Sequence, residues 1–207
     1  MNGLSTTDPK TLEATAAAVT ARGVRTEIVD TRAEALALVK SLIPAGMSVM
    51  TGASVTLKEI GLEDYLISNA HPWKNLKADI VAEKDPVKQR ALRRTAILSD
   101  YFLGSVHAVV ETGELVIASA SGSQLGPYAF SASNVIWIAG AQKIVKTLEE
   151  GISRIKEYIM PHEEERMRTL TGGKMGTMLG KLLIFEREPP FLERHITLIL
   201  VKEATGD

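Results

Sequence analysis

The stretch Asn134-Val-Ile-Trp-Ile-Ala139, closed by Gly140, decides the fold of this protein. It is a continuous apolar run that is short enough for a strand and typical of one covered on both faces. Strands of this kind occur in parallel sheets, because the crossover helices cover both faces of such sheets. The stretch therefore predicts an α/β protein with a buried, mainly parallel sheet.

The segments before this strand alternate between helix and strand. Asp8-Pro9 has the N-cap and first-turn proline of a helix start, and residues 24–29 have a strand composition. Thr31 and Glu34 fit a capping box at the start of a second helix, and the apolar run 47–50 follows as a second strand. This alternation is typical of parallel α/β sheets.

The segments after His107 predict a hairpin, a helix and two further strands. Residues 106–110 and 115–118 flank Glu111-Thr-Gly-Glu114, which is a hairpin signal. Apolar residues from Val145 to Ile159 recur at helical spacing, and we expect Pro161 to end that helix. A glycine-rich loop then leads to β-like runs at 182–185 and 196–201.

Composition limits the function classes. The chain has 207 residues, a net charge of −1 and 45% hydrophobic residues, which predicts one soluble domain over 1–207 and argues against nucleic-acid binding. Cysteine is absent, which excludes disulfides, iron–sulfur clusters and thiolate chemistry. No apolar run is long enough to span a membrane, and the N-terminus does not look like a signal peptide. We therefore expect a cytoplasmic protein.

Three loops of small residues follow predicted strands, at 51–54, 119–124 and 140–143. Ligands of open α/β sheets bind beyond the carboxyl ends of the strands, where backbone amides of such loops can approach an anion. The hydroxyls of Ser119, Ser121 and Ser123 beside Gly122 make the second loop the strongest of the three candidates. Ordinary tight turns are the alternative explanation.

Two titratable residues are candidates for chemistry. Glu111 ends an apolar strand, where it could act as nucleophile or general base or else be a solvated turn residue. His107 could carry protons or be a hydrogen-bonded packing residue. The four histidines lack the paired spacing of metal ligands, so we predict no metal site.

A predicted helix after Asp85-Pro86 carries many basic residues. They are Lys88, Arg90, Arg93 and Arg94. A solvated helix face explains them, and a surface for an anionic ligand or a partner protein is the alternative.

The segment Asp100-Tyr-Phe-Leu-Gly-Ser-Val-His107 resembles the LUD (lactate-utilisation) domain family. The acidic hairpin at 108–116, Ser121-Gly-Ser-Gln124 and Gly140-Ala-Gln-Lys-Ile-Val145 continue that resemblance. It implies the three-layer α/β/α fold of CoA transferases, ribose-5-phosphate isomerase and glucosamine-6-phosphate deaminase. Glu111-Thr-Gly113 is similar in kind to the nucleophilic glutamate of CoA transferases. The chain lacks the cysteine cluster that several family members carry, so we predict no cofactor.

The resemblance implies an accessory protein of lactate utilisation that binds a small anionic metabolite and works beside separate redox subunits. The alternatives are an isomerase or acyl-CoA-transferase-like enzyme that uses Glu111, and a non-catalytic metabolite sensor or scaffold. The predicted binding residues are Gly52, Ser54, Gly104, Ser105, His107, Gly113, Ser121, Gly122, Ser123, Gln124 and Lys143. From the apolar runs 182–185 and 196–201 we expect a homodimer, unless these strands only complete the sheet.

Overall fold

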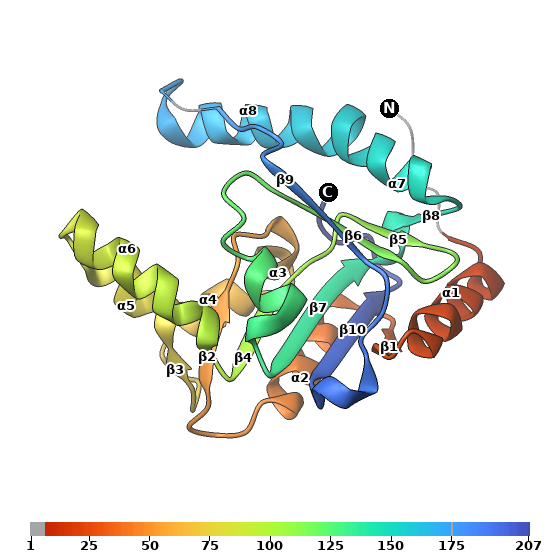
Figure 1. The fold of residues 1–207 in the computed structure, drawn as a ribbon, viewed down its shortest axis with the longest axis horizontal. Coiled ribbons are helices and arrows are strands. Elements are labelled where there is room, and N and C mark those ends of the chain that lie inside the picture. The colour runs from red at the N-terminus through yellow and green to blue at the C-terminus, as the bar shows by residue number, and fades with distance from the viewer. Residues whose placement is uncertain (1–6, 175) are drawn as a thin grey trace.

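The computed structural model describes residues 7–174 and 176–207 and shows an α/β fold built on a parallel sheet (Figure 1). The sheet has six strands in the order β1-β10-β7-β4-β2-β3, and every neighbouring pair is parallel. The strands are β1 (Arg25–Val29), β2 (Ser48–Thr51), β3 (Lys74–Asn75), β4 (Tyr101–Gly104), β7 (Asn134–Gly140) and β10 (His195–Val201). The predicted fold class is confirmed.

Strand β7 lies inside this sheet and serves two cores at once. Val135 and Trp137 point into the core on one face, while Ile136 and Ile138 point into the core on the other. All four side chains are buried. This double burial is the physical reason for the uninterrupted apolar run, because neither face of the strand meets water.

Helices cover one face of the sheet. They are α2 (Arg32–Leu42), α3 (Val55–Glu59) and α4 (Leu62–Ile67), and they supply core residues such as Val39, Leu57 and Leu62. The capping box of Thr31 and Glu34 at the start of α2 is formed as predicted.

The other face is covered by α1 (Pro9–Ala21) and by a second sheet. This sheet has the order β8-β5-β6-β9, with β5 (Ala108–Val110), β6 (Leu115–Ser119), β8 (Ile144–Val145) and β9 (Lys181–Phe185). Strands β5 and β6 form the predicted antiparallel hairpin, and Gly113 in its turn has φ +100°. Val145 belongs to β8, so its assignment to the following helix was wrong.

The helix after β8 passes through Pro161, which contradicts the predicted end at that residue. It runs from α7 (Leu148–Arg154) through a π-helical turn (Ile155–Ile159) into α8 (Met160–Thr171). The N–H of Met160 bonds to the carbonyl of Ile155, five residues earlier. The wider turn just before the proline accommodates its ring and its missing N–H, so the helix continues.

Two C-terminal strands and a helical arm complete the fold. Strand β10 lies between β1 and β7 in the main sheet, whereas β9 is at the edge of the small sheet. The run 196–201 thus completes the main sheet and is not available as a dimer surface. The expected homodimer stays a prediction that rests on the edge strand β9 alone. Helices α5 (Leu76–Ala82) and α6 (Pro86–Thr95) project from the body, and α6 buries none of its residues (Figure 1). Within 7–174 and 176–207, no helix has the length and apolar character needed to cross a membrane.

Candidate functional site

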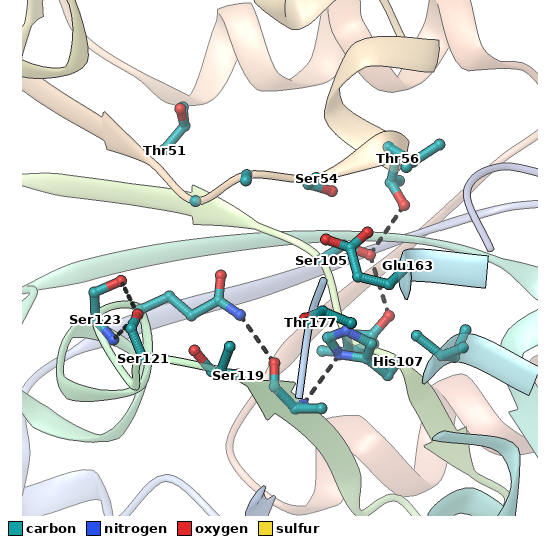
Figure 2. A pocket seen from close by; sticks show the side chains of 18 of the residues that line it. Thr51, Ser54, Thr56, Ser105, His107, Ser119, Ser121, Ser123, Glu163 and Thr177 are labelled. Atoms are coloured by element: carbon teal, nitrogen blue, oxygen red, sulfur yellow. Dashed lines mark hydrogen bonds between the residues drawn. The ribbon is translucent and has the colours of Figure 1, made fainter. Parts of the chain in front are cut away.

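A pocket of about 410 Å³ lies at the carboxyl ends of β2 and β4, where the main sheet meets the small sheet (Figure 2). Helices α5, α6 and α8 and the segment 177–179 form its remaining walls. Its charged lining residues are Lys77, Arg93, Lys143, Glu163, Arg166 and Asp207. Its polar lining residues are Thr51, Ser54, Thr56, Ser105, His107, Ser119, Ser121, Ser123, Gln124 and Thr177. The size is that of a small-molecule site.

Lys143 is the buried cation of this pocket, with 3% of the residue exposed. Its Nζ donates to Thr56 Oγ1 at 3.0 Å and to Ser105 Oγ at 3.2 Å, with the Val106 carbonyl at 3.5 Å. Across residues 7–174 and 176–207, no carboxylate forms an ion pair with it. A buried ammonium held only by neutral oxygens is costly, and an anionic ligand would offset that cost.

The C-terminal tail holds the Lys143 side chain in place. Gly206 has φ +72°, and a Cβ there would lie 2.0 Å from Thr56 Oγ1 and 2.8 Å from Lys143 Nζ. Gln142 donates from Nε2 to the carbonyls of Thr205 and Gly206, which fixes the tail against the end of β7. Only glycine allows the backbone to pass this close to the amine.

Burial governs the protonation of Lys143. Burial and the positive charge of Arg154 lower the pKa of Lys143 from 10.5 to about 7, although the carboxylates of Asp207 and Glu59 oppose them. The amine is therefore poised to gain or lose a proton near neutral pH.

His107 lies at the same side of the pocket and is neutral. Its Nδ1 accepts a hydrogen bond of 3.2 Å from the backbone N–H of Ala118, so the neutral ring carries its proton on Nε2. Burial, with the charges of Lys143 and Arg154, lowers the pKa of His107 to about 3. The ring can donate a hydrogen bond to a ligand but does not add a charge.

Hydroxyl groups line two parts of the pocket, with Ser105 and Thr56 on the side of His107 and with Ser121 and Ser123 on the opposite side (Figure 2). Thr56 Oγ1 and Ser105 Oγ are 3.1 Å apart, and Ser105 donates to the Val106 carbonyl. In the loop after β6, the Ser121 and Ser123 hydroxyls are 3.0 Å apart. Both groups are neutral donors suited to the oxygens of a carboxylate or phosphate.

The other pocket cations differ in how far they are neutralised. Arg166 makes two hydrogen bonds of 2.6 Å to Glu163, and Lys77 lies 3.4 Å from Glu63. Arg93 reaches the pocket from the exposed basic helix α6. The lining holds four basic and two acidic side chains, so the pocket is suited to an anion.

The structure brings eight of the predicted binding residues together in this pocket. They are Gly52, Ser54, Ser105, His107, Ser121, Ser123, Gln124 and Lys143. The other three predicted residues, Gly104, Gly113 and Gly122, are not among the lining residues. Gly104 packs under the Tyr128 ring, Gly122 packs against Lys181, and Gly113 packs against Ala18 in α1.

Glu111 is also away from the pocket. It follows β5, whereas His107 precedes that strand, so the two residues are about 13 Å apart along the extended chain. Glu111 lies in a separate shallow depression with Lys10, Thr11, Ala14 and Thr15. The predicted role of Glu111 as nucleophile or base stays a prediction, and this placement gives it no support.

Several pocket residues were not predicted. Thr56 lies in α3, Glu163 and Arg166 lie in α8, and Asp207 lies in the C-terminal tail. All four are outside the predicted loops 51–54, 119–124 and 140–143. Charged residues on a helix usually indicate a solvated face, so only tertiary packing identifies them as lining residues.

No metal centre is evident in the part of the chain that the structure describes. No group of three or more His, Asp or Glu side chains gathers with metal-ligand spacing there.

The parallel sheet and the pocket at its strand ends, with the buried Lys143, define an α/β domain with a pocket of small-molecule size. The family model described as the LUD domain matches residues 12–174, and the chain belongs to the LUD domain family. It is in general a lactate-utilisation-associated protein. No curated protein matches the chain.

A solved structure supports the fold. The crystal structure of a DUF162 family protein from Deinococcus radiodurans at 1.70 Å resolution is similar to this chain with a TM-score of 0.52. The alignment covers 93% of this chain and 96% of that chain, at 13% sequence identity. At this identity the similarity supports the fold alone.

Proposed function

We propose that the pocket binds a small anionic metabolite as part of lactate utilisation in the cytoplasm, with Lys143 as its central cation. The observation that carries the proposal is the buried Lys143 ammonium, which lines a ligand-sized pocket with only neutral oxygens as partners. A carboxylate placed there gains more from the charge than it would in water, because the surroundings have a low dielectric constant.

The neighbouring groups support the same ligand class. His107, Ser105, Ser121 and Ser123 all line this pocket, and their Nε2–H and hydroxyl groups are neutral hydrogen-bonding groups for the oxygens of a ligand. Ligand binding should raise the pKa of Lys143 from about 7, so an anion would be taken up together with a proton.

The accessory role follows from composition. A chain without cysteine cannot hold iron–sulfur clusters, so electrons from lactate would pass through separate redox subunits. The metabolite-binding chain would then supply recognition rather than electron transfer.

A thermal-shift screen tests the binding. The full chain is heated with lactate, pyruvate, sugar phosphates or acyl-CoA, and a ligand at about 100 times its Kd should add about 2.7 kcal/mol of stability. Lys143→Met keeps the length of the side chain but removes its charge. Lys146→Met is the matched control, because Lys146 is exposed and lies three residues further along.

The expected result is a rise in Tm with at least one small anion, lost in Lys143→Met and kept in Lys146→Met. Equal shifts in both variants would place the binding elsewhere on the chain. No shift with any of these anions would overturn the proposal.

A further inference from the structure

The Lys143 amine has surroundings that suit a reactive nitrogen as well as a bound charge. Its partners are two hydroxyls and one backbone carbonyl, and no ion pair holds it among the residues that the structure places. The hydroxyls of Thr56 and Ser105 can either accept from an ammonium or donate to a neutral amine. The site therefore accommodates both protonation states without rearrangement of the backbone.

We propose that Lys143 captures a small aldehyde or ketone that carries a carboxylate or phosphate, through a reversible imine between its Nζ and the carbonyl carbon. The inference rests on the proposed function for the anionic group of the ligand, and it adds a covalent step and a substrate class. A compound such as lactate, which has a hydroxyl in place of the carbonyl, would bind without forming the bond.

The step is balanced without an oxidant, a reductant or a cofactor. The nitrogen lone pair forms a bond to the carbonyl carbon, and the electron pair of the C=O π bond moves to the oxygen, which takes a proton. The nitrogen gives up one proton, the hydroxyl group takes another, and the C–O bond breaks to release water. The nitrogen lone pair then completes the C=N bond, and the nitrogen returns its remaining proton to the group that protonated the leaving hydroxyl, which gives the neutral imine and one water.

The pocket contains groups that can carry these protons. Thr56 Oγ1 and Ser105 Oγ lie 3.1 Å apart and each contacts the amine, so they form a short hydroxyl relay. The neutral His107 ring, with its proton placed on Nε2 by the bond from Ala118 to Nδ1, does not give up this proton but can donate a hydrogen bond to the carbonyl oxygen. General acid and base groups within hydrogen-bond reach are what carbinolamine formation and dehydration require.

The ionisation of Lys143 supports this reading of the geometry. With a pKa of about 7, close to half of the amine is neutral at neutral pH, whereas an ordinary lysine is almost wholly protonated. The charged and titratable groups that act on it are Arg154, His107, Asp207 and Glu59. Imine formation should therefore become faster as the pH rises through about 7.

Borohydride trapping tests the bond. The full chain is incubated with pyruvate or glyoxylate, reduced with sodium borohydride, and analysed by intact mass and peptide mapping. We expect one reduced adduct per chain, located on Lys143, with exposed Lys146 unmodified. Adducts spread evenly over the exposed lysines, or no adduct at saturating pyruvate, would overturn the inference.

Two ligands measured on the wild-type chain separate this inference from the proposed function. Lactate and pyruvate both carry the carboxylate, so calorimetry on each tests the anion site, whereas only pyruvate has the carbonyl that borohydride trapping requires. If the wild-type chain binds lactate and pyruvate equally and is never trapped, the covalent step fails and the anion site stands. If neither compound binds and none is trapped, both proposals fail.

Discussion

At the scale of single residues, Lys143 links the stability of the fold to pH. Its pKa is about 7 in the folded chain and near 10.5 when unfolded. Between these pH values the unfolded chain holds a proton that the folded chain has released. The free energy of unfolding therefore rises as the pH increases from about 7 toward 10.5, and it falls again as the pH is lowered toward 7. We expect urea unfolding at pH 7, 8 and 9 to show this rise for the wild type and a flatter profile for Lys143→Met. Identical slopes in the two proteins would contradict the assigned burial of the amine.

Gly104 gives a second prediction at this scale. A Cβ at this position would lie 1.6 Å from the hydroxyl of Tyr128, a fully buried side chain. Gly104→Ala forces this ring to move and should cost about 1–3 kcal/mol of stability by overpacking. Chemical denaturation would measure the loss, and Tyr128→Phe in the same chain should recover part of it because the clashing oxygen is gone. An unchanged stability in Gly104→Ala would show that the ring moves freely.

The candidate residues show what local sequence can reveal about a site. Loop residues such as Ser121 and Gln124 were predictable, because small and polar residues after a strand mark a strand end. Gly104 leaves space for the Tyr128 hydroxyl, and local sequence does not show this contact because the two residues are distant in the chain. The position of Glu111 outside the pocket was not predictable for a similar reason. A strand end is visible in the sequence, but which of the two sheets receives it is not.

At the scale of elements, Arg194 fixes the π-helical segment Pro127–Ser131. Its guanidinium donates to the carbonyls of Pro127, Tyr128, Ala129 and Ala132 and lies 3.1 Å from Glu188. Both charged side chains are almost fully buried, at 5% and 4% exposure. The segment packs its Tyr128 ring against Phe102 and Trp137, so the anchor also supports the core.

Removing the Arg194 side chain should lower the free energy of unfolding substantially. We expect Arg194→Ala to lose about 3–5 kcal/mol, because Glu188 would be left buried without its counter-charge. The double variant Arg194→Ala with Glu188→Gln should lose less than Arg194→Ala alone, as measured by urea denaturation. If the second substitution gives no recovery, the buried ion pair is not the source of the loss.

The elements also show where sequence rules apply and where they fail. The caps at Asp8, Thr31 and Asp85 were predictable, since they depend on neighbours within one helical turn. The passage of the helix through Pro161 was not predictable, because no residue pattern in the sequence indicates the π-helical turn Ile155–Ile159 that precedes the proline. The second sheet was missed for a related reason. Its edge strand β9 pairs with a partner more than sixty residues away in the chain.

At the scale of the whole molecule, the last strands belong to the same fold as the first. The family model ends at residue 174, yet β10 lies between β1 and β7 and pairs with both. A chain truncated to 1–174 would leave β1 without its strand partner and leave the edge of β7 that faces β10 unpaired. We expect this truncation to lack a cooperative unfolding transition by circular dichroism, in contrast to the full chain. A cooperative transition at a similar Tm would contradict the account of the sheet.

The central claim is that this molecule recognises a small anion at Lys143, and a ligand-bound crystal structure tests it most directly. Crystals of the wild-type chain would be soaked with lactate, the non-reactive ligand, at a concentration above its calorimetric Kd. The account predicts lactate in the pocket, with its carboxylate within hydrogen-bond distance of Lys143 Nζ and Ser105 Oγ. Lactate bound beside Glu111 and Lys10, with the Lys143 pocket free of it, would contradict the account.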